Sequence, residues 1–328
     1  MMQAIVQDAY GSADVLRLGD VERPRVGERD VLVEVHAAGL DPGVWHLMTG
    51  RPYLVRLMGF GLRRPKDRVA GQDVAGRVAA VGSGVARLRP GDEVFGTCTG
   101  AFAEYARGRE DTLAPKPANL TFEQAAVVPT SAATALQALC NTAHVEAGQR
   151  VLVIGAGGGV GTFAVQIARA LGAEVTGVCS AGKTEMVHAI GARHVIDYER
   201  EDFADGRRRH DVILDTAGNR SLSHLRRALE PEGTLVIVGG EGGGPLLGGT
   251  DRQLRAALLS PFVRQTLGSL FSTVVAADLE RLRELLEAGQ VVPVVGRTCP
   301  LGEVPDAVRQ LEAGHARGKI AIAVRPEA

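Results

Sequence analysis

The chain has 328 residues, of which 45 % are hydrophobic and 23 % are charged, and its formal net charge is -1. This length suggests about two domains, and this composition excludes an intrinsically disordered chain. A net charge so close to zero provides no field that would attract nucleic acid or an anionic membrane.

The amino-terminal segment MMQAIVQDAY lacks the basic start of a secretory signal and already contains an acidic residue. The four cysteines are scattered along the chain, and no two of them have the CxxC spacing. This distribution argues against a disulfide framework and against a cysteine zinc cluster. We therefore expect a cytoplasmic protein.

Short β-branched segments interrupted by glycine and proline dominate the first third of the chain. The pattern predicts curled antiparallel strands with glycine turns, as in a small β-barrel. Near Asn119 the pattern changes, because Thr121 can cap a helix with Glu123 and Gln124 in its first turn, and an alanine-rich helical run follows. The expected strands lie within residues 4–10, 15–21, 30–40, 69–82, 89–96 and 101–108.

From Gln149 onward, apolar strand-like segments alternate with helix-like segments. This alternation predicts a parallel, doubly wound sheet of the Rossmann type. Residues 241–251 are typical of a loop, residues 252–271 of a helical stretch interrupted at Pro261, and residues 278–324 alternate between helix and strand. The expected strands of the sheet are 150–155, 174–180, 194–198, 211–218 and 234–240, and its helices are 162–172, 183–192 and 221–233.

The segment VLVIGAGGGVG joins a strand to a helix through a glycine-rich turn. A dinucleotide fingerprint needs a tight turn, then a residue without a side chain beside the pyrophosphate, then a residue that allows close helix packing. Ala156, Gly158 and Gly161 occupy these three positions, with alanine in the first. The amides of Gly159 and Val160, at the start of the helix, would face the pyrophosphate. A glycine-rich turn without a ligand is the alternative.

The end of the second strand of the predicted sheet indicates which dinucleotide is bound. NAD sites usually place Asp or Glu there, whereas this chain has Ser180, followed by Lys183. A hydroxyl and a cation suit a 2′-phosphate, and Tyr198 could close the same pocket. The sequence therefore favours NADP(H), although Lys183 could also be an exposed lysine at a helix start.

Two later strands of the predicted sheet also end in glycine. Gly218, Gly239 and Gly240 follow the fourth and fifth strands of the sheet. Because glycine has no side chain, we expect the backbone at these positions to approach the dinucleotide closely.

Several motifs together resemble those of the medium-chain dehydrogenase/reductase superfamily, and more narrowly its zinc-independent quinone oxidoreductase branch. They are GQDVAGRVAAVGSGV, RPGDEVFG, VVPTSAATALQAL, the GAGGGVG turn and the closing GHARGKIAIAV. The resemblance implies a GroES-like catalytic domain made from both ends of the chain, a Rossmann domain, a nicotinamide bound in the cleft between them, and in many members a homodimer. We expect the catalytic domain at residues 1–120, the NADP(H) domain at 121–270 and the C-terminal return at 271–328.

Zinc-dependent members of this superfamily hold a catalytic metal on Cys, His and Cys. The corresponding positions here are Asp41, Gln72 and Thr130, and the segment 96–103 lacks a four-cysteine lobe. A catalytic zinc needs three thiolate, imidazole or carboxylate ligands and an open position, which this set does not provide. We therefore expect no metal.

The quinone oxidoreductase branch usually shows an N-P-x-D pattern followed by R-x-G-x-Y. Here the first pattern begins with Asp41 and ends with Val44, while Tyr53 is retained. The candidate catalytic residues are therefore Asp41 and Tyr53. The Tyr53 hydroxyl would donate a hydrogen bond to a developing oxyanion, or its ring merely walls the pocket. His46 is a further possible general acid or a surface residue.

The resemblance places Thr130 at the ribose–nicotinamide end of the cofactor. The predicted activity is hydride transfer from NADPH to a quinone or an activated enone. One alternative is an NADPH-binding regulatory protein with little or no turnover. Another is an oxidoreductase of the same family that acts on a different carbonyl compound or alcohol.

Overall fold

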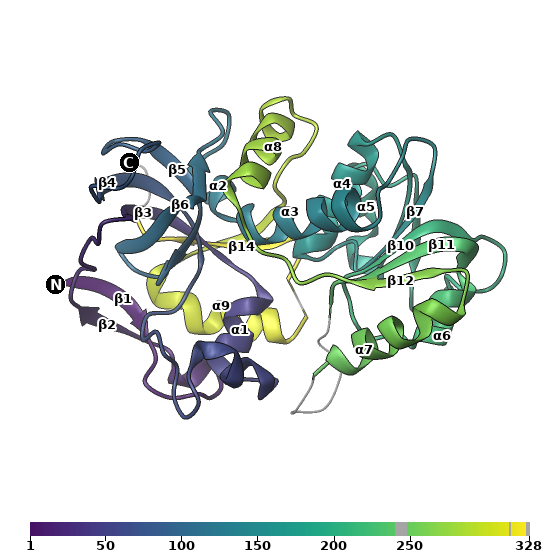
Figure 1. The fold of residues 1–328 in the computed structure, drawn as a ribbon, viewed down its shortest axis with the longest axis horizontal. Helices are drawn as coiled ribbons and strands as arrows, with labels where there is room; N and C mark the ends of the chain where they lie inside the picture. The colour runs from purple at the N-terminus through teal and green to yellow at the C-terminus, as the bar shows by residue number, and fades with distance from the viewer. Residues whose placement is uncertain (240–247, 315, 326–328) are drawn as a thin grey trace. The chain divides into compact units, whose positions relative to one another are not determined.

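The computed structural model describes residues 1–239, 248–314 and 316–325 (Figure 1). Backbone contacts divide the chain into two compact units. Unit 1 combines both ends of the chain, and unit 2 contains most of the middle. Unit 1 consists of Met1–Ala133, Thr273–Ala288 and Pro293–Ala328, and unit 2 consists of Thr134–Ser272 and Gly289–Val292.

Unit 1 is built on a curled, mainly antiparallel sheet with the strand order β13-β14-β3-β4-β5-β6. Strand β6 also pairs with β3, so the four strands from β3 to β6 close on themselves, which confirms the predicted small barrel. The C-terminal strand β14 pairs antiparallel with β3, and β13 pairs parallel with β14. The strands are β1 (Met2–Val6), β2 (Arg17–Val21), β3 (Asp30–Leu40), β4 (Asp73–Val81), β5 (Glu93–Thr99), β6 (Tyr105–Pro115), β13 (Val295–Pro300) and β14 (Lys319–Ala323).

The helices of unit 1 pack around this sheet. Side chains such as Val33, Phe102 and Leu113 are fully buried in its core. Strands β1 and β2 form a separate antiparallel pair. The helices are α1 (Pro42–Thr49), α2 (Phe122–Ala126), α8 (Ala276–Glu287) and α9 (Val304–Glu312), with the short helices η1 (Ala13–Val15), η2 (Arg56–Phe60) and η6 (Leu301–Glu303), while α3 (Pro129–Leu136) spans the boundary of the two units.

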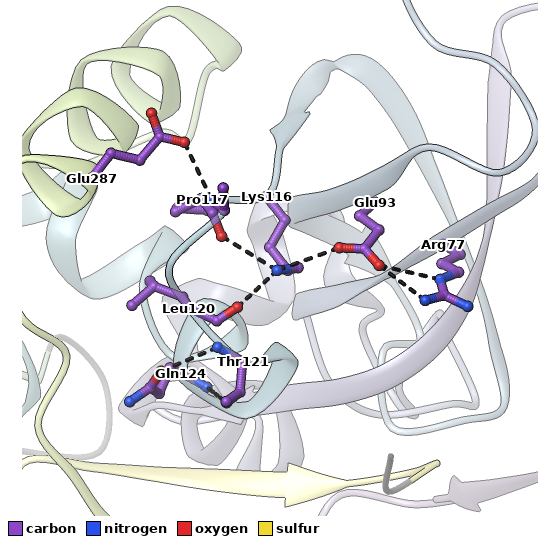
Figure 2. Close-up of polar contacts among 9 residues, drawn as sticks. Arg77, Glu93, Lys116, Pro117, Leu120, Thr121, Gln124 and Glu287 are labelled. Carbon is purple, nitrogen blue, oxygen red and sulfur yellow. Dashed lines mark hydrogen bonds and ion pairs between the residues drawn. The ribbon is translucent and has the colours of Figure 1, made fainter. Parts of the chain in front are cut away.

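A buried lysine fixes the connection from β6 to α2 (Figure 2). The Nζ of Lys116 donates to the carbonyl oxygen of Leu120 at 2.7 Å and lies 3.3 Å from a carboxylate oxygen of Glu93. Helix α2 then begins with the predicted capping box between Thr121 and Gln124. The backbone N–H of Ala118 donates to Glu287 at the end of α8, so this connection is also tied to the C-terminal return.

Helix α2 belongs to unit 1, so the boundary falls at Ala133 and not at residue 120 as we expected. The reason is close packing on β3. The Phe122 ring stacks on His36 with a centroid distance of 4.2 Å. A Cβ on Gly39 would lie 2.4 Å from the carbonyl oxygen of Ala126, so only glycine allows this approach.

Unit 2 is a parallel six-stranded sheet with the order β12-β11-β10-β7-β8-β9 and helices packed against it, which confirms the predicted doubly wound fold (Figure 1). The strands are apolar because both faces are covered. The strands are β7 (Arg150–Ile154), β8 (Glu174–Cys179), β9 (His194–Asp197), β10 (His210–Asp215), β11 (Leu229–Ile237) and β12 (Thr266–Ser269). The helices are α4 (Gly159–Ala170), α5 (Thr184–Ala189), α6 (Leu222–Arg227) and α7 (Thr250–Leu259), with the short η3 (Gln137–Thr142), η4 (Ala181–Lys183) and η5 (Ser260–Phe262).

The stretch 252–271 differs from the prediction, because its last part is strand and not helix. Thr266 and Leu267 pair in parallel with Thr234 and Leu235 of β11. Local sequence favours helix there, but the open edge of β11 provides backbone partners that only the folded sheet offers. Most of the expected loop 241–251 lies outside the described residues.

No helix in the described part of the chain combines the length and the apolar character needed to cross a bilayer.

Candidate functional site

The glycine-rich turn of unit 2 leads directly from β7 into α4. Gly155 has a left-handed backbone with φ +84°, and the N–H groups of Gly155 and Ala156 both donate to the carbonyl oxygen of Val178. Gly158 is the N-cap of α4 and makes no side-chain cap bond. The N-cap side chain therefore does not occupy the first N–H groups of α4, which point out of the helix end as an anion site requires.

Two glycines of this turn are required by its geometry. A Cβ on Gly161 would lie 2.1 Å from the carbonyl oxygen of Gly155, so any side chain would push α4 away from the turn. Gly155, which carries the left-handed conformation, was not among the residues singled out from sequence. In the sequence, Gly155 could have been recognised by its position directly after the apolar strand.

Polar groups gather beyond β8, where the sequence predicted a 2′-phosphate pocket. The Lys183 side chain lies against the glycine turn, because a Cβ on Gly157 would be 2.7 Å from its Cδ. The N–H of Tyr198 donates to the carbonyl oxygen of Cys179, which brings Tyr198 beside Ser180. The guanidinium of Arg220 lies 5.9 Å from the Tyr198 ring. The sequence analysis did not single out Arg220. It could have been recognised as a basic residue a few positions after the end of a predicted strand.

Asp215 connects the end of β10 to its surroundings. Its carbonyl oxygen accepts from the N–H groups of Val238 and Gly239 after β11, and its carboxylate accepts from the N–H of Gly218, which has φ +70°, and forms an ion pair with Arg252. A Cβ on Gly239 would lie 2.3 Å from the carbonyl oxygen of Thr216, so the two strand ends approach closely. Gly240 lies outside the described residues.

In unit 1, Asp73 is the centre of a buried polar cluster. Its carboxylate accepts hydrogen bonds from the backbone N–H of Thr130 at 3.2 Å and from the Thr130 hydroxyl. The Nζ of Lys319 lies 4.0 Å from the same carboxylate, and both side chains are almost inaccessible to solvent. The cluster joins β4, α3 and β14, which come from three distant parts of the sequence.

Asp41 lies near this cluster at the start of α1. Its Oδ1 accepts from the N–H of Gly43 at 2.7 Å and so caps the helix, while its Oδ2 is buried without a hydrogen-bond partner. Burial, helped by the charge of Asp41, raises the pKa of Asp73 to about 7, although Lys319 and the Thr130 hydrogen bonds oppose the change. With this raised pKa, Asp73 is partly protonated near neutral pH.

The side chains at the three expected metal positions do not fit a catalytic zinc. They are the carboxylate of Asp41, the amide of Gln72 and the hydroxyl of Thr130, and the Thr130 hydroxyl is already bonded to Asp73. Within residues 1–239, 248–314 and 316–325, no three His, Cys, Asp or Glu side chains lie together as a metal site requires.

A cavity of about 170 Å³ opens in unit 1 beside these residues. Its walls combine apolar and polar side chains, and the pKa of the Cys98 thiol is raised by burial, so the thiol is un-ionised at neutral pH. Six of the lining residues are Val44, Leu47, Phe60, Lys66, Gln72 and Cys98.

Two candidates from the sequence lie outside the lining of this cavity. Tyr53 is 38 % exposed, and its ring faces the Arg56 guanidinium at 4.7 Å. The Nδ1 of His46 lies 2.8 Å from the carbonyl oxygen of Arg51. Neither residue is brought into contact with Asp73 or Thr130 by any described hydrogen bond.

Comparisons with known proteins find similar dehydrogenases and reductases along nearly the whole chain. Residues 27–118 match the alcohol dehydrogenase GroES-like domain, and residues 190–322 match the zinc-binding dehydrogenase family. The quinone oxidoreductase of Pongo abelii is 30 % identical over 98 % of this chain and 97 % of its own length. The NADPH-dependent alkenal/one oxidoreductase of Arabidopsis thaliana is 32 % identical over 98 % of this chain and 79 % of its own length. The solved quinone oxidoreductase structure from Coxiella burnetii is 29 % identical, with a TM-score of 0.86 and 99 % of each chain covered.

The raised pKa of Asp73 predicts a distinctive pH dependence of stability. Because the folded pKa of about 7 exceeds the ordinary value of 3.8, the folded state holds a proton that the unfolded state lacks between these limits. The free energy of unfolding should therefore fall as pH rises from about 4 to about 7, by at most about 1.4 kcal/mol per pH unit from this group. Asp73→Asn should flatten the curve of Tm against pH in this range.

The control is Asp20→Asn, which removes an exposed carboxylate of β2. It should leave the slope of Tm against pH as it is in the unmodified protein. Parallel curves for Asp73→Asn and the unmodified protein would contradict the assignment of this proton to Asp73.

Proposed function

Because the chain belongs to the medium-chain dehydrogenase/reductase superfamily, in its quinone oxidoreductase-like branch, we propose that it is an NADPH-dependent reductase of quinones or activated enones. The observation that carries this choice of substrate is the set Asp41, Gln72 and Thr130 at the metal positions. Without a Lewis acid, the acceptor oxygen must be stabilised by hydrogen bonds alone. Quinones and enones are already strong electrophiles and tolerate this.

The chain's own residues bind and orient the dinucleotide in this proposal. When bound, the nicotinamide supplies the hydride. The N–H groups of Gly159 and Val160 hold the pyrophosphate, and Gly158 has no side chain that would keep it away. Gly218 and Gly239 let the backbone approach, and Gly240 is expected to do the same.

The nicotinamide end of the cofactor is assigned to unit 1 residues. Thr130 contacts the ribose–nicotinamide part, and its hydrogen bonds to Asp73 fix the orientation of its hydroxyl. Asp41 remains a candidate catalytic residue because of its place in the early motif, at the start of α1. Most of the rate enhancement comes from holding the reacting carbons about 3–3.5 Å apart.

The preference for NADPH rests on the groups beyond β8. Ser180 and Lys183 stand where an acidic residue would select NAD, and Tyr198 and Arg220 add a hydroxyl and a second cation. A phosphate attracts such groups, and a carboxylate would repel it. The proposal also includes a cytoplasmic location, and a homodimer as in many members of the family.

The function is tested by following NADPH oxidation at 340 nm with 1,4-benzoquinone or an α,β-unsaturated ketone as acceptor. We expect turnover that survives removal of metals with a chelator, with much less than one zinc per chain by elemental analysis. About one zinc per chain together with loss of activity on chelation would contradict the metal-free mechanism. NADPH binding without turnover of any acceptor would favour a regulatory protein.

The cofactor preference predicts the effect of Lys183→Ala. One charge-assisted contact to phosphate contributes about 1.5–3 kcal/mol, so NADPH should bind roughly ten- to a hundredfold more weakly, and NADH nearly as before. Fluorescence titration of the bound dinucleotide measures both constants. Arg29→Ala, at an exposed site in unit 1, is the control. Equal affinity of the unmodified protein for NADH and NADPH would refute the assignment.

Tyr53 is proposed to donate a hydrogen bond to the acceptor oxygen during hydride transfer. A phenol at its usual pKa stays protonated at neutral pH and can donate. Tyr53→Phe keeps the ring and removes the hydroxyl, so we expect a single-turnover rate lower by about tenfold, less than the 10²–10³ of a strongly dependent site. An unchanged rate at saturating quinone would assign the ring to the pocket wall.

A further inference from the structure

We propose that the carboxamide of Gln72 binds the carbonyl oxygen of the acceptor, with the cavity of unit 1 holding the apolar body of a conjugated ketone or quinone. The inference rests on the proposed function, which it deepens by naming the subsite and its donor. It assigns to Gln72 the polarising role that a metal would otherwise have.

The Gln72 amide is available for a ligand. Gln72 lines the cavity and is partly exposed, while the next residue, Asp73, is fully buried. Within the described part of the chain, no hydrogen bond engages the Gln72 side chain. An amide NH₂ carries two donors and remains uncharged at all working pH values, so it can donate to a ketone oxygen and to an enolate oxygen alike.

The backbone around Gln72 is rigid. The Gln72 carbonyl oxygen accepts from the N–H of Cys98 at 2.9 Å, and the Gly71 carbonyl oxygen accepts from Gly100 and Ala101. Gly71 has φ +93°, and a Cβ there would lie 2.6 Å from the backbone nitrogen of Phe102. Since these contacts fix the Cα of Gln72, only its side-chain torsions need to adjust to a ligand, which lowers the cost of donating.

The surroundings of Gln72 suit an apolar carbonyl compound. The side chains of Val44, Leu47 and Phe60 form apolar walls, while the charged residues Lys66 and Asp67 lie at the exposed part of the cavity. The volume of about 170 Å³ corresponds to one ring, because an engineered apolar cavity of about 150 Å³ binds benzene. The amide oxygen of Gln72 lies toward α1, 3.9 Å from where a Cβ on Gly43 would stand.

Other donors near the cavity are less suited. Lys66 is exposed at its rim, where water competes for the ammonium group. Tyr53 does not line the cavity, so the hydrogen bond proposed for it would go to an oxygen outside the cavity, such as the second carbonyl oxygen of a quinone. Gln7 also lines the cavity but is almost fully buried, whereas Gln72 is partly exposed to the cavity and stands directly before Asp73.

The electron balance of the reaction explains what Gln72 stabilises. In an enone, the hydride from NADPH forms a new C–H bond at the β-carbon, and the π electrons shift onto the carbonyl oxygen. NADPH becomes NADP⁺, and a proton from water then converts the enolate to the saturated ketone. The hydrogen bond from Gln72 becomes stronger as the oxygen gains charge, so it lowers the barrier and not only the dissociation constant.

A binding experiment tests the contact without requiring turnover. Isotope-edited infrared difference spectra of cyclohex-2-enone labelled at the carbonyl carbon are recorded with the full chain. We expect the C=O band to move to lower frequency on binding, and Gln72→Leu to remove this shift. The control Gln3→Leu makes the same exchange at an exposed position of β1 and should keep it. A shift that survives Gln72→Leu but disappears in Lys66→Met would overturn the inference.

Kinetics separate polarisation from a general structural defect. Gln72→Leu should lower kcat/KM by about 100-fold for cyclohex-2-enone but only about tenfold for 1,4-benzoquinone, because the quinone needs less polarisation. Gln72→Asn should recover part of the loss. An equal loss with both acceptors and no recovery would mean a structural role only. Turnover unaffected by Gln72→Leu defeats this inference alone, while a band shift without turnover of any acceptor defeats only the proposed function.

Discussion

The buried carboxylate of Asp73 is the interaction on which the architecture of unit 1 depends. It joins β4 to α3 through Thr130 and to the C-terminal strand β14 through Lys319. Because a buried polar group needs partners, Asp73 is satisfied by the two hydrogen bonds from Thr130, with Lys319 beside it. The return of the chain end to the barrel therefore completes the surroundings of this buried group as well as the strand pairing.

The same cluster bears on the chemistry proposed for the site. A lysine ammonium and a threonine hydroxyl occupy the surroundings of Asp73, and Asp41 caps α1 close by. Under the proposed function, stabilisation of the acceptor oxygen falls to hydrogen-bond donors. Quinones and enones are strong electrophiles that need little polarisation, which is why they are the proposed substrates.

In unit 2, the proposed dinucleotide site is built mainly from a backbone turn and uses few side chains. Gly161 permits α4 to start against the carbonyl oxygen of Gly155, and this contact aims the first N–H groups of the helix outward. The side chains of Lys183, Tyr198 and Arg220 then come from three different strand ends. Backbone groups would bind what all dinucleotides share, and these side chains would distinguish among them.

The sequence by itself determined the elements whose signals are local. The alternating apolar strands, the glycine turn before α4 and the Thr121 capping box follow from short-range sterics and hydrogen bonding, and the structure contains them where the sequence predicted. The sequence alone also showed that Asp41, Gln72 and Thr130 stand where zinc-dependent members of the superfamily have metal ligands. The tertiary structure alone decided that Thr266 to Ser269 form a strand, that α2 belongs to unit 1, and that Gln72 faces a cavity while Asp73 does not. These outcomes depend on contacts between residues far apart in the chain, such as Asp73 with Lys319 and Gly39 with Ala126, and such contacts leave no periodic pattern in the sequence.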